Sequence, residues 1–256
     1  MTRISTIRKQ LVLMTALGLC GYPMLQAQTP SGTEVLEKMT SVWTVENSKG
    51  VMTQTIKTSS GQYRTFELES YSANEGESTL MRYLQPASIR GQAFLMLNNA
   101  NDIWTYFPRT NRVRKLASHA KKQKAQGSDF TYEDMGSGDE WLEQFEATNL
   151  GAAIHVDQRI WRLQLEGIPD QEPAYPKLMV LVRQSDYLPL QVDYYDDRGE
   201  VLKSLYLEDI QEIEGIPTAM LMTMRNHKDA TETMMEMLSV TYNWEPPAGF
   251  FSERNL

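Results

Sequence analysis

The sequence predicts a mainly β protein in which one antiparallel sheet of about eleven strands is covered on one face by a helix. Three observations lead to this prediction. Short apolar runs rich in aromatic and β-branched residues recur along the chain, separated by turn residues. One segment near the start has apolar residues at helical spacing. A sheet of this many strands rarely stays flat, so we expect it to curve or close.

The chain opens on a segment that is typical of a secretory signal peptide. Three cations precede an apolar run that ends at Leu19 and is too short to span a bilayer. A Leu-Gln-Ala cleavage site then ends at Ala27. We therefore expect residues 1–27 to be removed on export to the periplasm, and residues 28–256 to form a single domain.

Cys20 is the only cysteine, and it follows the apolar run, where a lipoprotein signal carries its lipidated cysteine. The preceding Leu-Gly-Leu places a bulky leucine where such signals have a small residue, so lipidation at Cys20 is the less favoured alternative. Cleavage after Ala27 leaves no cysteine for disulfides. It also removes three cations and no acids, which changes the formal charge from −8 to −11. Such an acidic chain is a poor candidate for nucleic-acid binding, and we exclude that class.

We expect an amphipathic helix at residues 31–43. Its apolar residues recur at spacings of three and four, which places them on one face: Val35, Leu36, Met39, Val42 and Trp43. Ser31 or Thr33 can cap the helix, and Glu34 lies near its positive end. The apolar face of this helix needs a sheet to cover.

The remaining chain supplies that sheet. A hairpin at 49–58 and 62–71 comes before a four-stranded meander at 79–84, 93–97, 103–107 and 112–116. A long polar loop at 118–138 and a short helix at 140–145 follow. Further strands are expected at 159–166, 178–182, 188–195, 201–207, 218–226 and 233–242. Several of these runs are apolar at successive positions, so the alternation does not say which face points inward.

No pattern in the sequence indicates catalysis. His119, His155 and His227 lie far apart without the spacing of metal ligands, and neither a Gly-Xaa-Ser-Xaa-Gly motif nor a glycine-rich phosphate loop occurs. Carboxylates between residues 129 and 143 could supply an acid and base pair or a hard-metal site, but their irregular spacing favours a solvated acidic segment. We expect no enzymatic activity, no metal and no cofactor. A hydrolase without a recognisable motif is the remaining alternative.

A basic segment follows the meander. Between residues 109 and 126 the chain has seven cations and no acid: Arg109, Arg112, Arg114, Lys115, Lys121, Lys122 and Lys124. These cations could dock on anionic lipid headgroups or on an acidic partner. They could equally form a solvated loop that pairs with the acids of the next segment.

The 15 methionines are a second unusual feature, since many fall in expected strands where β-branched residues are the default. Flexible thioethers suit a surface that adapts to variable apolar ligands, although ordinary core filling explains them equally well. If a ligand cavity exists, our candidates for its lining are Trp43, Phe66, Leu68, Met81, Phe94, Met96, Trp104, Tyr106 and Met222.

Three sequence blocks indicate a family. In order, they are RYLQPASIRGQAFL (82–95), DIWTYFPRTNRVRKL (102–116) and GSDFTYEDM (127–135). Together they resemble the LolA-like outer-membrane lipoprotein-sorting proteins, and more narrowly a branch often associated with exporters of the resistance-nodulation-division (RND) type. One departure is Lys-Ala-Gln at 124–126, where an apolar residue is expected just before Gly127.

The resemblance implies an unclosed barrel whose concave side is covered by helices over an apolar cavity. In the best-known members of the family, that cavity holds the acyl chains of a lipoprotein crossing the periplasm. The expected function is therefore a periplasmic carrier for lipoprotein acyl chains or another lipid. The alternative is a docking module that carries nothing and binds an RND-type exporter or an envelope complex.

Overall fold

A computed structural model describes residues 29–135 and 140–256, and within them thirteen strands form one antiparallel sheet. The expected signal peptide and Cys20 lie outside the described residues. The strands of the first half are β1 (Ser48–Lys57), β2 (Tyr63–Ala73), β3 (Ser78–Gln85), β4 (Ala93–Leu97), β5 (Asp102–Phe107) and β6 (Arg112–Lys115). Those of the second half are β7 (Phe145–His155), β8 (Gln158–Gly167), β9 (Lys177–Arg183), β10 (Pro189–Tyr195), β11 (Val201–Ile213), β12 (Ile216–Asn226) and β13 (Thr231–Tyr242). The predicted mainly β fold is confirmed.

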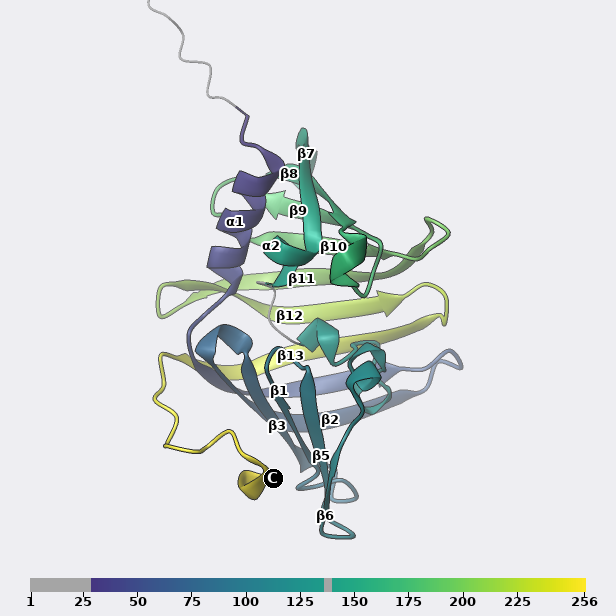
Figure 1. Ribbon diagram of the computed structural model, residues 1–256, viewed down its shortest axis with the longest axis vertical. Helices are drawn as coiled ribbons and strands as arrows, with labels where there is room; N and C mark the ends of the chain where they lie inside the picture. The colour runs from purple at the N-terminus through teal and green to yellow at the C-terminus, as the bar shows by residue number, and fades with distance from the viewer. Residues whose placement is uncertain (1–28, 136–139) are drawn as a thin grey trace, which may run out of the picture.

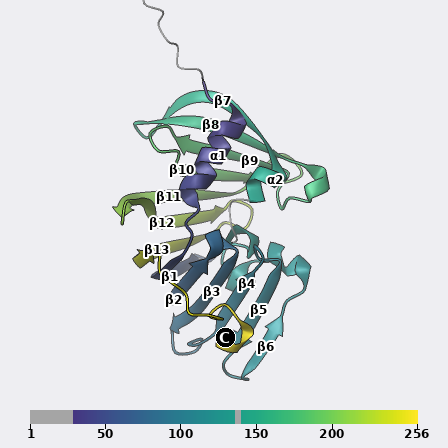
Figure 2. The same cartoon turned by 60° about the vertical axis from the view of Figure 1, so that its left-hand side comes forward.

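The first and last strands of the sheet order are not the first and last of the chain. The order is β6-β5-β4-β3-β2-β1-β13-β12-β11-β10-β9-β8-β7, so β1 and β13 pair in the middle, with Ser48 opposite Tyr242. Each half is a meander of sequential neighbours. The strands β3 to β6 are steeply inclined to β9 to β12, which shows how strongly the sheet twists and curves (Figures 1 and 2).

Helix α1 (Gly32–Trp43) forms where the apolar spacing predicts it. Ser31 and Glu34 build a capping box, since the Glu34 N–H donates to the Ser31 hydroxyl (3.1 Å) and the Ser31 N–H donates to the Glu34 carboxylate (2.7 Å). Gly32 lies so close to the backbone of Ala147 in β7 that a side chain would not fit there. Val35, Leu36 and Met39 are buried beneath the helix. None of the described helices is long and apolar enough to cross a membrane.

Two apolar clusters lie on opposite faces of the sheet. Alternate residues of β4 separate them, because Phe94 and Met96 join the cluster on the inner face, which carries α1, whereas Ala93 and Leu95 join the cluster on the outer face. The C-terminal segment after β13 covers the outer cluster. Its Trp244 donates an indole N–H to the Ser48 carbonyl (2.8 Å).

Candidate functional site

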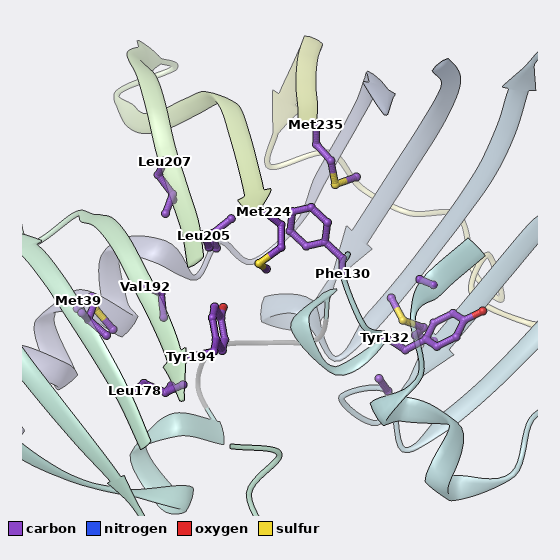
Figure 3. Packing of buried hydrophobic residues seen from close by; sticks show 14 of the residues in the cluster. Met39, Phe130, Tyr132, Leu178, Val192, Tyr194, Leu205, Leu207, Met224 and Met235 are labelled. Atoms are coloured by element: carbon purple, nitrogen blue, oxygen red, sulfur yellow. The ribbon is translucent and has the colours of Figure 1, made fainter. Parts of the chain in front are cut away.

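An apolar cavity of about 220 Å³ lies on the inner face of the sheet. Its floor consists of side chains that come from seven different strands: Met52, Met81, Leu178, Tyr194, Leu205, Met222 and Met235. Its cover consists of Phe130, Glu133, Asp134, Met135 and Tyr175, together with Trp141 and Phe145 around the short helix α2 (Trp141–Gln144). Figure 3 shows the rings of Phe130 and Tyr194 among the thioethers of Met224 and Met235. The lining is therefore mainly aliphatic, thioether and aromatic.

Residues 120–135 supply the first part of this cover, including Phe130 and Met135, and we call them the cover loop. The sequence predicted a polar loop at 118–138 whose acids form a solvated segment, but residues 120–135 fold back on themselves in 3₁₀ turns, with a β-bridge between Lys124 and Thr131. Phe130 and Tyr132 are buried, at 4% and 5% exposure. The expectation of a solvated acidic segment is thus wrong for Asp129 and Asp134, whose side chains are 2% exposed, and the two aromatic side chains between them pack on the inner cluster.

A buried ion pair ties the cover loop to the sheet. The Lys203 ammonium of β11 contacts the Asp134 carboxylate, and the two side chains are only 3% and 2% exposed. Asp134 also accepts hydrogen bonds from the Thr131 N–H (2.6 Å) and the Tyr175 hydroxyl (3.2 Å). The ammonium lies 5.1 and 5.0 Å from the ring centres of Tyr175 and Tyr194. Because the charges are buried, removing one partner leaves the other unpaired in an apolar setting.

Asp129 makes a second anchor. Its carboxylate is 2% exposed and accepts hydrogen bonds from the hydroxyls of Thr231 (2.5 Å) and Thr233 (2.9 Å) on β13. Lys124 bridges Asp129 (3.1 Å) to Asp229 (2.8 Å) in the turn before β13. Lys-Ala-Gln at 124–126, where the family resemblance led us to expect an apolar residue, therefore has a structural role, since Lys124 pairs with two acids.

Glu133 is the one carboxyl group of the cavity whose buried oxygen Oε2 has no hydrogen-bond partner among the described residues. Burial raises the pKa of this carboxyl above its ordinary value, and the neighbouring Lys121 and Lys122 only partly oppose that effect. A polar group with a free acceptor thus lies in the mainly apolar lining of the cavity, to which Asp134, Glu140 and Gln144 add the other polar side chains. Burial also raises the pKa of the Tyr175 and Tyr194 hydroxyls, which keeps both phenols neutral.

Six of the nine predicted cavity residues belong to or pack against the inner cluster, but only two of them line the cavity itself. Met81 and Met222 line the cavity, Leu68, Phe94 and Met96 are buried in the inner cluster, and Phe66 packs against it. The side chain of Trp43 lies outside the described residues. Sequence reasoning missed the cover residues Phe130 and Met135, although both belong to the block GSDFTYEDM that indicated the family.

Trp104 and Tyr106 lie elsewhere, and this corrects the expectation that they line the same cavity. Both pack against the outer cluster, beneath the C-terminal segment with Phe250 and Phe251. The reason is the parity of β5, in which Trp104 and Tyr106 alternate with the inner-facing Ile103 and Thr105.

The seven cations of the basic segment separate into two groups. Three of them have polar partners: Lys115 pairs with Asp102 (2.6 Å), Lys124 pairs with two aspartates, and Lys121 donates to Asn101 (3.2 Å). Arg109, Arg112, Arg114 and Lys122 have no ion pair within the described part of the chain. Of these, Arg114 lies over the ring of Phe107 at 5.9 Å. An exposed basic strip therefore remains along β6 and its neighbouring turns.

A serine, an aspartate and a histidine meet on the second half of the sheet, but not in a hydrolytic arrangement. The Ser204 hydroxyl donates to Asp193 (2.6 Å), and it lies 2.9 Å from His227 Nε2. In a catalytic triad the histidine takes the serine proton and the carboxylate binds the other ring nitrogen. Here the carboxylate holds the serine directly, and Ser204 is 2% exposed. Nor do the described residues contain a group of three or more His, Cys, Asp or Glu that could hold a metal.

A family model described as "Uncharacterized protein" matches residues 75–256, and no curated protein matches the chain. Among solved structures, a DUF1329 family protein from Desulfovibrio piger is 22% identical, with a TM-score of 0.81, and the match covers 88% of this chain and 97% of that one. A candidate outer-membrane lipoprotein-sorting domain from Vibrio parahaemolyticus is 25% identical over the same shares, with a TM-score of 0.76. A LolA superfamily protein from Nitrosomonas europaea is 20% identical, with a TM-score of 0.73 over 89% and 100% of the two chains.

These matches confirm the resemblance that the three sequence blocks indicated. The family model spans more than half of the chain, and the similar structures are matched over nearly their whole length. The unclosed antiparallel sheet with its covering helix is the fold that they share. The chain therefore belongs to the uncharacterized family whose model matches residues 75–256, and its fold is that of the LolA-like proteins.

Proposed function

We propose that the protein is a periplasmic carrier that holds an acyl chain, from a lipoprotein or from another lipid, in the cavity beneath the cover loop. The observation that carries this proposal is the apolar space itself, which the protein's own side chains leave open on the inner face. The LolA superfamily fold supports it, as does the description of the similar V. parahaemolyticus domain as a lipoprotein-sorting domain. The amino-terminal signal pattern supports export to the periplasm.

The energetics of such a cavity are favourable. Each acyl CH₂ removed from water contributes about 0.8 kcal/mol, so burying six of them contributes roughly 5 kcal/mol. Five methionines line the space: Met52, Met81, Met135, Met222 and Met235. Their unbranched side chains change rotamer easily, which allows the cavity to adapt to chains of different shape. A cavity of about 220 Å³ holds only part of a long acyl chain, so full loading requires the cover loop to move outward.

Mass spectrometry of natively purified protein tests the proposal. The mature chain, isolated from its exported form, should release an acyl lipid on organic extraction and should take up a fluorescent fatty acid. Met222→Trp fills the cavity and should reduce uptake at least tenfold. Leu238→Trp, at a β13 side chain that is 52% exposed outside the cavity, is the matched control and should leave uptake unchanged. If the protein neither releases a bound lipid nor takes up the fatty acid, the carrier proposal is refuted.

A docking module without cargo is the second candidate, and the exposed basic strip favours it. Arg109, Arg112, Arg114 and Lys122 are exposed and form no ion pair within the described residues of an acidic protein, which suits an acidic face of an RND-type exporter or an envelope complex. Neutralising Arg112, Arg114, Lys121 and Lys122 together separates the two functions. Loss of association with envelope proteins while fatty-acid uptake persists would assign docking to this strip. If the variant keeps both its association with envelope proteins and its fatty-acid uptake, the strip serves neither docking nor cargo binding.

A further inference from the structure

The hairpin between β7 and β8 ends in an exposed apolar tip. Ile154 is 67% exposed and Val156 is 78% exposed, and Leu150 on the same strand is 40% exposed. The tip residues Leu-Gly-Ala-Ala-Ile-His-Val (150–156) contain no carboxylate and no lysine or arginine. Neither the inner nor the outer apolar cluster includes Ile154 or Val156, so core packing does not explain these side chains.

Local folding does not explain Val156 either. The two turn residues, Val156 and Asp157, have φ values of 43° and 62°. This left-handed turn favours Asn-Gly or Asp-Gly, and a β-branched side chain is strained in it. An exposed valine here costs conformational energy and gains nothing from the fold. A contact outside the molecule is the remaining physical reason for its presence.

Two arginines flank the apolar tip. Arg159 lies opposite Ile154 in the register of the hairpin, and Arg162 donates to the Leu150 carbonyl (2.9 Å). Neither forms an ion pair within residues 29–135 and 140–256. Asp157 is the single acid between Leu150 and Arg162, so the tip is cationic on a chain whose formal charge is −8.

The tip lies at one end of the molecule, beside the start of α1. Asn149 donates to the Pro30 carbonyl (2.8 Å), and β7 reaches the upper end of the view in Figure 1. Ala152 pairs with Trp161, which packs against the inner cluster. Because directly paired residues share a face, the apolar side of the tip continues the inner face that holds the cavity.

We propose that the β7–β8 tip inserts into the headgroup region of an anionic lipid bilayer, and the inference rests on the proposed carrier function. Ile154 and Val156 enter the apolar boundary of the bilayer, while Arg159 and Arg162 contact lipid phosphates. This orientation turns the inner face toward the membrane from which an acyl chain is taken or to which it is delivered.

Vesicle flotation of residues 28–256 tests the proposal, with phosphatidylcholine vesicles that either contain or lack phosphatidylglycerol. Val156→Asn suits a left-handed turn, so this substitution should not lower the melting temperature. The double variant Ile154→Ser with Val156→Asn should weaken partitioning into the vesicles at least tenfold. Arg159→Gln should weaken binding about fivefold on anionic vesicles and not on neutral ones. Leu238→Ser removes an exposed leucine elsewhere and should change nothing.

A fluorophore reports the insertion directly. The expected mature chain has no cysteine, so Ile154→Cys accepts a single environment-sensitive label, whose emission should shift to the blue with vesicles. The same label at Leu238→Cys should not shift. Unchanged emission at position 154, or unchanged flotation of the double variant, overturns the proposal. If the protein dimerises, and the tip variant loses dimerisation but still floats with vesicles, the tip is a contact between two copies. That result also overturns the membrane proposal.

Uptake of a fatty acid delivered from solution separates this inference from the carrier proposal. Tip variants should retain such uptake, because the cavity lies elsewhere in the fold, and should lose only acquisition of the fatty acid from vesicles. Uptake that fails in the unmodified protein refutes the carrier proposal, whatever the vesicles show.

Discussion

Replacing Lys203 with methionine probes the buried anchor of the cover loop. The substitution keeps a side chain of similar length but leaves the Asp134 carboxylate, 2% exposed, without its counter-ion. Breaking a buried pair on one side costs about 3–5 kcal/mol, a large part of the 5–15 kcal/mol by which domains are usually stable. The loss of two ring contacts, to Tyr175 and Tyr194, acts in the same direction.

Urea unfolding followed by tryptophan fluorescence measures this cost. Lys203→Met should lower the free energy of unfolding by about 3–5 kcal/mol. The double variant with Asp134→Asn should recover at least about half of the loss, because no buried charge remains. The Thr131 N–H and the Tyr175 hydroxyl bond different oxygens of the Asp134 carboxylate, so the amide oxygen can accept from the Thr131 N–H while the amide NH₂ donates to the Tyr175 hydroxyl oxygen. Lys115→Met, at an exposed pair with Asp102, is the matched control and should cost less than about 1 kcal/mol. Equal losses at Lys203 and Lys115 would refute the reasoning.

Three further outcomes are expected. Burial raises the pKa of Glu133 above 4.5 in the folded protein, because the buried site favours the neutral carboxyl. The stability that this neutral carboxyl contributes is complete at low pH and is lost as the pH rises through the folded-state pKa. Glu133→Gln should therefore raise the melting temperature at pH 8 and not at pH 4. Phe130→Ala should destabilise by about 3–5 kcal/mol and increase fatty-acid uptake, whereas a decrease would show that the ring contacts cargo. Ser31→Ala should cost about 1 kcal/mol in urea unfolding, and no cost would discount the capping box.

Local signals predicted most of the fold. The Ser31 cap and the apolar spacing predicted α1, and turn residues between apolar runs predicted twelve of the thirteen strands. Their bounds agree within a few residues except for β11, which was expected at 201–207 and extends to Ile213. The missing strand is β7, whose residues 146–153 alternate small and polar side chains with few large apolar ones. Such a strand is stabilised by pairing with β8, which a single-sequence pattern does not report.

The cavity was harder to predict than the fold. Met81 and Met222 were identified, but Trp104 and Tyr106 were assigned to the wrong face because two apolar clusters lie on opposite sides of the same strands. Composition shows that a side chain is apolar, while its face depends on strand parity and on what covers each side. The cover loop was missed for a related reason, since Phe130 is buried by long-range contacts with β13 and its neighbours.

The pairing of β1 with β13 at the centre of the sheet has a consequence for how the chain can be made. Either half can begin from neighbouring hairpins, but the join between them pairs Ser48–Lys57 with Thr231–Tyr242, which are far apart in the sequence. The centre of the sheet therefore stays open until both strands are present, whichever half folds first. A truncation that removes the final strand leaves two separate sheets, each with an open edge, and such edges are prone to aggregation.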